Sequence, residues 1–190
     1  MKKTLHYILI LLTSTLLQNQ LLLAQENPST TIQATQKQAL LLGQCSPKQL
    51  EQEPFAKWFL PNFEKYQVDS SLIPALKKAF KGKRMEFFVG TWCGESRADM
   101  PGVLKILQAA KVDSSQFKLI FLNNSGTMNR QSPGHEEEGK NIVRVPTYIL
   151  YKGKKEIGRI IDAPKESFEK DLLKILTGKP YTPHFSELVL

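Results

Sequence analysis

The feature that most constrains this chain is a short apolar run, Met85–Val89, that leads through a turn into Cys93 and an amphipathic segment. A run of this length with almost no polar side chain is typical of a buried central strand. Residues 95–110 place apolar side chains at helical spacing, and a second buried strand is predicted at Phe117–Leu122. The chain therefore contains a β-α-β unit with a cysteine at the strand-to-helix turn.

The rest of the chain completes a small α/β domain. Two more strands are predicted at Tyr148–Tyr151 and Glu156–Ile161, joined by a hairpin turn at Lys152-Gly153-Lys154. Further helices are predicted at Gln36–Leu42, Glu53–Tyr66, Ser70–Phe80 and Pro164–Leu176. This order predicts a central mixed sheet with helices on both faces. The polar, Gly/Pro-punctuated segment Asn123–Lys140 is expected to be a mobile surface insertion.

The N-terminus has the pattern of a secretory signal peptide. Lys2 and Lys3 precede the apolar run Tyr7–Leu17, and Ala24 offers a small residue for cleavage. A membrane anchor is the rival interpretation, but eleven residues fall short of the ~20 that span a bilayer. We expect a signal peptide at 1–24 and a periplasmic or secreted protein. Residues 25–69 would form a flexible lead-in and a helical N-terminal extension, 70–177 the main domain and 178–190 a C-terminal tail.

Charge and cysteine content exclude several classes of protein. The net charge of the 190-residue chain is +8, but its lysines are dispersed over polar faces and turns, which favours a solvated surface over nucleic-acid binding. The two cysteines, Cys45 and Cys93, are too few for a disulfide scaffold or a structural zinc site. No metal and no cofactor are expected.

The position of Cys93 predicts thiol chemistry. At a helix N-terminus, unpaired backbone N–H groups and the positive end of the helix dipole favour a thiolate. The thiolate is the species that attacks a disulfide. Glu95 opposes this effect through like charge while suiting the start of a helix, so the net direction of the pKa shift stays open.

Trp92-Cys93-Gly94 resembles the W-C-G-x-C motif of the thioredoxin-like superfamily. Pro101 corresponds to the proline that kinks that family's active-site helix, and Val145-Pro146-Thr147 resembles its cis-proline motif. The resemblance covers residues 70–177 and implies a three-layer α/β/α fold with Cys93 as the attacking thiol. It also implies that Trp92, Gly94 and Val145-Pro146-Thr147 contact the substrate.

Two departures from the family pattern affect the chemistry. Ser96 replaces the second motif cysteine, so no disulfide forms within the motif. Ser96 is either an inert replacement or a hydrogen-bond donor that stabilises the thiolate. The family's buried acid corresponds to Phe87, while the adjacent Glu86 should point to the other face of the strand.

These features predict an exported thiol–disulfide exchange protein, an oxidoreductase or isomerase that forms mixed disulfides with protein substrates. A membrane electron donor upstream is a candidate partner. Cys45 is either a buried small apolar residue, a structural disulfide partner or a resolving thiol for Cys93. Two alternatives remain open: a redox-inactive peptide-binding module, and a protein similar to monothiol glutaredoxins, whose C-G-F-S motif Cys93-Gly94-Glu95-Ser96 resembles.

Overall fold

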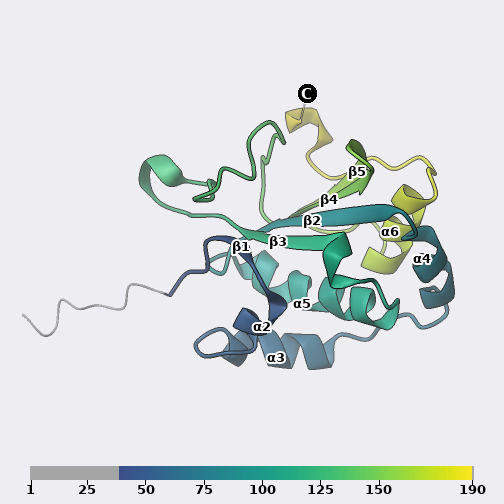
Figure 1. Cartoon of the computed structure of the whole chain (residues 1–190), viewed down its shortest axis with the longest axis horizontal. Helices are drawn as coiled ribbons and strands as arrows, with labels where there is room; N and C mark the ends of the chain where they lie inside the picture. Colours follow the sequence, from purple (N-terminus) through teal and green to yellow (C-terminus); the bar gives the residue numbers. More distant parts are fainter. Residues whose placement is uncertain (1–38, 190) are drawn as a thin grey trace, which may run out of the picture. The chain divides into compact units, whose positions relative to one another are not determined.

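The computed structural model describes residues 39–189, and these form one compact unit (Figure 1). The predictions for residues 1–38, which include the signal peptide, lie outside the described residues. The α-helices are α2 (Pro47–Leu50), α3 (Ala56–Lys65), α4 (Ile73–Ala79), α5 (Gly94–Ala109) and α6 (Phe168–Leu176). The strands are β1 (Gly43–Cys45), β2 (Lys83–Val89), β3 (Phe117–Phe121), β4 (Thr147–Lys152) and β5 (Lys155–Ile161). Three short 3₁₀ helices are η1 (Ser114–Gln116), η2 (Gly126–Met128) and η3 (Ser186–Leu188).

The five strands form one mixed sheet in the order β1-β3-β2-β4-β5. Strands β2 and β3 are parallel with Phe87 opposite Leu119, and α5 is the crossover between them. Strand β4 runs antiparallel to β2 with Tyr148 opposite Phe87, and β5 completes the hairpin. The predicted β-α-β unit, hairpin and closing helix are confirmed, and the protein is a mixed α/β domain.

The edge strand β1 was not predicted. A helix was expected up to Leu42, but residues 39–42 are irregular and Gly43–Cys45 pair antiparallel with β3. Three residues that include a glycine and a glutamine give no alternating pattern, so their pairing depends on the exposed edge of β3. The sheet thus takes one strand from outside the range 70–177.

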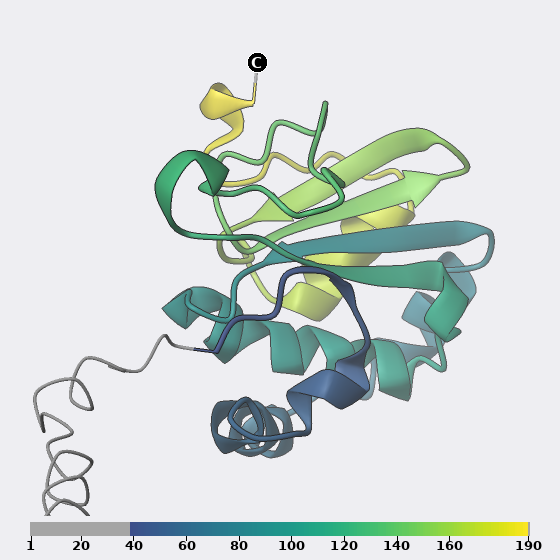
Figure 2. The same ribbon diagram turned by 60° about the vertical axis from the view of Figure 1, so that its left-hand side comes forward.

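All five α-helices pack on one face of the sheet, which corrects the expected α/β/α layering (Figures 1 and 2). Alternate residues of each strand separate into two clusters, because successive side chains point to opposite faces. Phe87, Leu119 and Tyr148 belong to the cluster that the helices cover, whereas Phe88 and Ile120 belong to a smaller cluster on the opposite face. The polar segment 123–146 covers that second face, and its composition explains why only the short turn η2 forms there.

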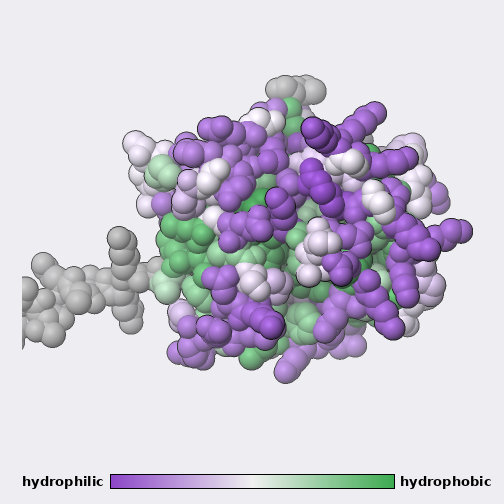
Figure 3. Space-filling model, in the orientation of Figure 1, coloured by the Kyte–Doolittle hydropathy of each residue, from purple (hydrophilic) through white to green (hydrophobic). Residues whose placement is uncertain are grey.

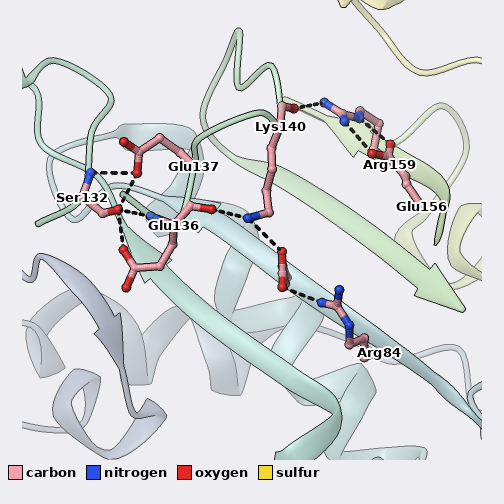
Figure 4. Close-up of polar contacts among 8 residues, drawn as sticks. Arg84, Ser132, Glu136, Glu137, Lys140, Glu156 and Arg159 are labelled. Carbon is pink, nitrogen blue, oxygen red and sulfur yellow. Dashed lines mark hydrogen bonds and ion pairs between the residues drawn. The ribbon is translucent and has the colours of Figure 1, made fainter. Parts of the chain in front are cut away.

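A layer of charged side chains attaches this segment to the sheet (Figure 4). Lys140 approaches the buried Glu86 carboxylate, with 3.8 Å between Nζ and Oε2, and lies over the Phe88 ring. Glu86 also pairs with Arg84, and Arg159 donates to the Lys140 carbonyl at 2.8 Å. Glu86 therefore points away from the helix-covered core, as predicted. These contacts fix at least Lys140 on the sheet, so this end of the segment is not a free insertion.

Hydrophilic residues cover most of the surface seen in Figure 3. This agrees with the dispersed lysines of the sequence. Within residues 39–189, no helix has both the length and the apolar character required to cross a bilayer.

Candidate functional site: the cleft at Cys93

Cys93 is the residue that turns the chain from β2 into α5. Its backbone is extended (φ −83°, ψ 127°), and its carbonyl accepts the first helical hydrogen bond from the Arg97 N–H at 3.1 Å. Cys93 is thus the N-cap residue of α5, at the end of the helix where unpaired N–H groups concentrate. Pro101 lies eight residues, or about two turns, further along the same helix and is buried.

The Cys93 thiol is 6% exposed and touches two acceptors. Sγ lies 3.3 Å from the Val145 carbonyl oxygen and 3.1 Å from Glu95 Oε2. The Val145-Pro146 peptide bond is cis, as the family resemblance predicted. The sulfur atom predicted to attack the substrate therefore contacts the Val145-Pro146 motif. The two are 52 residues apart in the chain.

Burial is the largest influence on this thiol and raises the pKa of Cys93 above its ordinary value. Hydrogen bonds from the Ser96 hydroxyl and backbone N–H act in the opposite direction, and the Glu95 carboxylate raises the pKa further. Ser96 is 1% exposed, and its Oγ accepts a hydrogen bond from the Gly90 N–H at 3.2 Å. That bond leaves the hydroxyl proton available for sulfur, which favours the hydrogen-bonding role of Ser96 over an inert replacement.

Trp92 shapes the approach to the thiol. Its indole N–H donates to the Leu122 carbonyl at 2.8 Å, which fixes the half-buried ring beside the C-terminal ends of β2 and β3. Gly90 makes room for this ring, since a Cβ on Gly90 would lie 2.6 Å from two indole atoms. Trp92 is thus a wall of the site as well as part of the smaller core cluster.

An open cleft of about 500 Å³ begins at Cys93. Its lining residues are Trp92, Cys93, Glu95, Asn129, Arg130, Val143, Arg144, Val145 and Asp162. Of the other predicted substrate contacts, Gly94 is exposed at the start of α5, and Thr147 is buried with its hydroxyl donating to the Arg144 carbonyl at 2.7 Å. The structure therefore brings Cys93, Ser96, Trp92 and Val145 together, with Thr147 as a support beneath them.

Cys45 does not belong to this site. Its side chain packs against the core cluster on the helix-covered face, whereas Cys93 belongs to the cluster on the opposite face. Cys45 lies on β1, which is separated from β2 by β3, and both cysteines are free thiols. A disulfide requires Cα atoms within about 7 Å, so pairing would need β1 to leave the sheet.

Three charged residues of the site region were not found from the sequence. Arg130 and Arg144 were part of, or next to, the segment read as an insertion, and only the folded segment brings them to the cleft. Asp99 lies on α5, six residues after Cys93, and burial together with the charges of Asp162 and Glu95 raises its pKa to about 6. Asp99 follows Glu95 by four residues on α5, so the two side chains are neighbours on the helix surface. This spacing was the one sequence signal that could have placed Asp99 near the site.

No metal centre is apparent in the described part of the chain, where no three His, Cys, Asp or Glu side chains are grouped as ligands.

No protein-family model and no curated protein matches this chain. A solved structure of a protein of unknown function from Pseudomonas aeruginosa is similar to it with a TM-score of 0.46 and 12% sequence identity, over 65% of this chain and 81% of that one. A likeness at this level assigns neither a fold family nor a function.

Proposed function

We propose that the protein is an exported, thioredoxin-like thiol–disulfide exchange protein that acts through Cys93. One observation carries the proposal: Cys93 Sγ lies at a helix N-cap, 3.3 Å from the Val145 carbonyl, at the mouth of an open cleft. A substrate disulfide entering the cleft would meet sulfur on one side and a backbone acceptor on the other. Export rests on the signal-peptide pattern of residues 1–24.

The order of elements also supports a thioredoxin-like assignment. Parallel strands β2 and β3 with α5 between them, the β4–β5 hairpin and α6 follow the order that the family resemblance implies. The departure lies on the second face of the sheet, where an irregular segment takes the place of a helix. This segment contributes Arg130 and Arg144 to the cleft, so the departure adds side chains to the site.

The proposed reaction is a thiolate–disulfide exchange. The Cys93 thiolate attacks one sulfur of a substrate disulfide, the substrate S–S bond breaks, and a new S–S bond joins Cys93 to the substrate. The second substrate sulfur leaves with the electron pair as a thiolate and takes a proton from solvent. The product is a mixed disulfide, and no net oxidant or reductant is consumed in this step.

Release of the mixed disulfide must use a thiol from outside the motif. Ser96 is scarcely ionised at neutral pH and does not displace a sulfur, and Cys45 packs on the opposite face of the sheet. The substrate's own second thiol or an external thiol therefore resolves the complex. Resolution by the substrate's own thiol isomerises its disulfides, whereas resolution by an external thiol leads to reduction.

A trapping experiment with the mature protein tests the proposal. Wild type, incubated with an unfolded, oxidised protein, should accumulate a mixed disulfide that a non-reducing gel detects. Ser96→Cys should release the substrate faster, because a second thiol in the same turn acts at high local concentration. Ser96→Ala is the matched control and should keep the complex. An equal yield of complex from Cys93→Ala would overturn the proposal.

A second candidate, a redox-inactive peptide-binding module, is favoured by the direction of the Cys93 pKa. Burial raises this pKa, which leaves less thiolate at neutral pH than an ordinary cysteine has. In such a module the cleft would bind peptides without covalent capture. Retention of a peptide by Cys93→Ala with unchanged affinity, together with no mixed disulfide in wild type, would favour this candidate.

A further inference from the structure

The cleft beside Cys93 is lined by charged side chains of both signs. Arg130 and Arg144 belong to the segment that covers the sheet, whereas Glu95 belongs to the first turn of α5 and Asp162 follows β5. Within residues 39–189, none of these four side chains forms a salt bridge. Their charges are therefore available to a ligand.

Both arginines are held at the cleft by groups that leave the positive charge unneutralised. Arg130 Nη1 donates to the Val143 carbonyl at 2.6 Å. The Arg144 guanidinium lies over the Phe185 ring, 4.6 Å from its centroid, in a cation–π contact. An arginine oriented in this way retains N–H groups for a carboxylate, the anion that its planar fork fits.

The acidic residues of the cleft are also held in place, in the case of Asp162 through its backbone. The Asp162 backbone N–H donates to the Pro146 carbonyl at 2.8 Å, next to the backbone acceptor that faces Cys93. Glu95 and Asp162 both act on the half-buried Asp99 and raise its pKa, so the three carboxyl groups lie within electrostatic range of one another. These neighbouring carboxylates attract a cation.

The cleft also continues beyond the thiol. A second cavity of about 590 Å³ shares Asn129, Arg130 and Val143 with the first and reaches Leu188, which is 52% exposed. The two cavities are adjacent at these shared residues, and we call them together the groove, which extends from Cys93 past Arg130. A groove of this extent fits an extended polypeptide better than a small disulfide.

We propose that the groove selects a polypeptide whose reacting cysteine has an acidic residue on one side and a basic residue on the other. The acidic residue lies toward Arg130 and Arg144, and the basic residue toward Glu95 and Asp162. The two charges thus fix the direction in which the substrate chain crosses the thiol. This inference rests on the proposed function, because the thiol must meet the substrate sulfur.

Short peptides that differ only in charge order provide the test. Each has an acetylated N-terminus, an amidated C-terminus and one cysteine as its pyridyl disulfide, flanked as Lys-Cys-Glu, Glu-Cys-Lys or Gln-Cys-Gln. Cys93 attacks the peptide sulfur, and the uncharged pyridine-2-thione that leaves is followed by absorbance. Each rate is divided by that of an unfolded cysteine peptide with the same disulfide, which removes the intrinsic reactivity of the probe.

One of the two charged orders should react about fivefold faster than the other, the size expected from exposed ion pairs. Arg130→Gln with Arg144→Gln, and separately Asp162→Asn, should bring this ratio toward one. Asparagine tolerates the left-handed backbone of Asp162 (φ 67°), so that variant keeps the local fold. Lys154→Gln, in the β4–β5 turn at the far end of these strands, is the matched control and should keep the ratio.

Equal rates for the two orders, or a ratio that survives all the cleft variants, would overturn the inference. In that case exchange with the uncharged peptide would still support the proposed function. Failure of all three peptides to react would overturn the proposed function, and the inference with it. Glu95 is kept intact throughout, because it touches Sγ and would change every rate.

Discussion

At Cys93, two neighbouring side chains act on the thiol in opposite directions. Ser96 donates to sulfur and lowers the pKa of Cys93, while the Glu95 carboxylate raises it. Glu95→Gln should therefore lower this pKa and increase the rate of alkylation near neutral pH, because a larger fraction of the thiol is ionised. Ser96→Ala should have the opposite effect. The measurement is the alkylation rate against pH in Cys45→Ser backgrounds, and changes of the same sign in both variants would contradict this assignment.

Asp99 predicts a dependence of stability on pH. Its pKa rises from 3.8 to about 6 in the folded protein, so the ionised carboxylate is less favourable there than in the unfolded chain. The resulting loss of stability is absent below the unfolded pKa and develops as the pH rises through about 6. Asp99→Asn should raise the free energy of unfolding by about 1–2 kcal/mol near pH 8 after allowance for solvent screening, and by little near pH 4. Urea unfolding at both pH values measures this, and an equal gain at both would contradict the assignment.

Helix α5 contains two glycines, and only one of them lies where a side chain would not fit. A Cβ on Gly102 would overlap the Tyr66 ring, whose hydroxyl bonds Glu169, so this glycine permits the approach of the chain after α3 to α5. A Cβ on Gly94 meets nothing within 4 Å. Gly102→Ala should lower the free energy of unfolding by about 1–3 kcal/mol through overpacking. Gly94→Ala should leave it unchanged or raise it by up to about 1 kcal/mol.

The same urea titration compares both variants on one helix. A Gly102→Ala protein as stable as wild type would show that the Tyr66 ring moves aside without cost. A stability loss in Gly94→Ala as large as that in Gly102→Ala would assign the effect to α5 as a whole and not to the Tyr66 contact.

The elements that could be predicted from sequence are those whose side-chain pattern matches their burial. Met85–Val89 forms the buried part of β2, since a strand covered on both faces has no polar position except Glu86, which finds Arg84. β1 could not be predicted, because its three residues acquire structure only by pairing with β3. The helix-free second face was missed for a related reason: nothing in the polar segment 123–146 signals that Val145 and Ile142 would cover Phe88 and Ile120.

The residues of the candidate site also divide into those that could be predicted from the sequence and those that could not. Cys93, Trp92 and Val145 could be predicted, because a resemblance in local sequence marks each of them. Arg130 and Arg144 could not, since their place depends on how a long segment folds back across the sheet. The closeness of Glu95 to Cys93 could be predicted because the two residues are near neighbours in the chain. How Glu95, burial and Ser96 together set the pKa of Cys93 could be worked out only from the three-dimensional structure.

Across the whole molecule, the two cysteines belong to opposite faces of the sheet. Mild oxidation of the folded protein should therefore leave both thiols in the reduced state or form disulfides between molecules, without an internal Cys45–Cys93 bond. Intact-mass analysis after alkylation under denaturing conditions should count two labelled thiols per reduced monomer. A monomer with no labelled thiol would contradict the arrangement of β1. Likewise, Cys45→Ser should leave the lifetime of trapped mixed disulfides unchanged.

The most direct test of the central claim compares Cys93 in the folded protein with the same cysteine in an unfolded peptide of residues 86–107. Both react with an uncharged peptide disulfide, in a Cys45→Ser background, over a range of pH. The account predicts that the folded protein reacts faster, by about tenfold or more at pH values above neutrality, since the cleft positions the disulfide against sulfur. It also predicts that the rate keeps rising to a higher pH than that of the peptide, because burial raises the pKa of Cys93. A folded protein that reacts no faster than the peptide at any pH would contradict the claim that Cys93 is an exchange thiol.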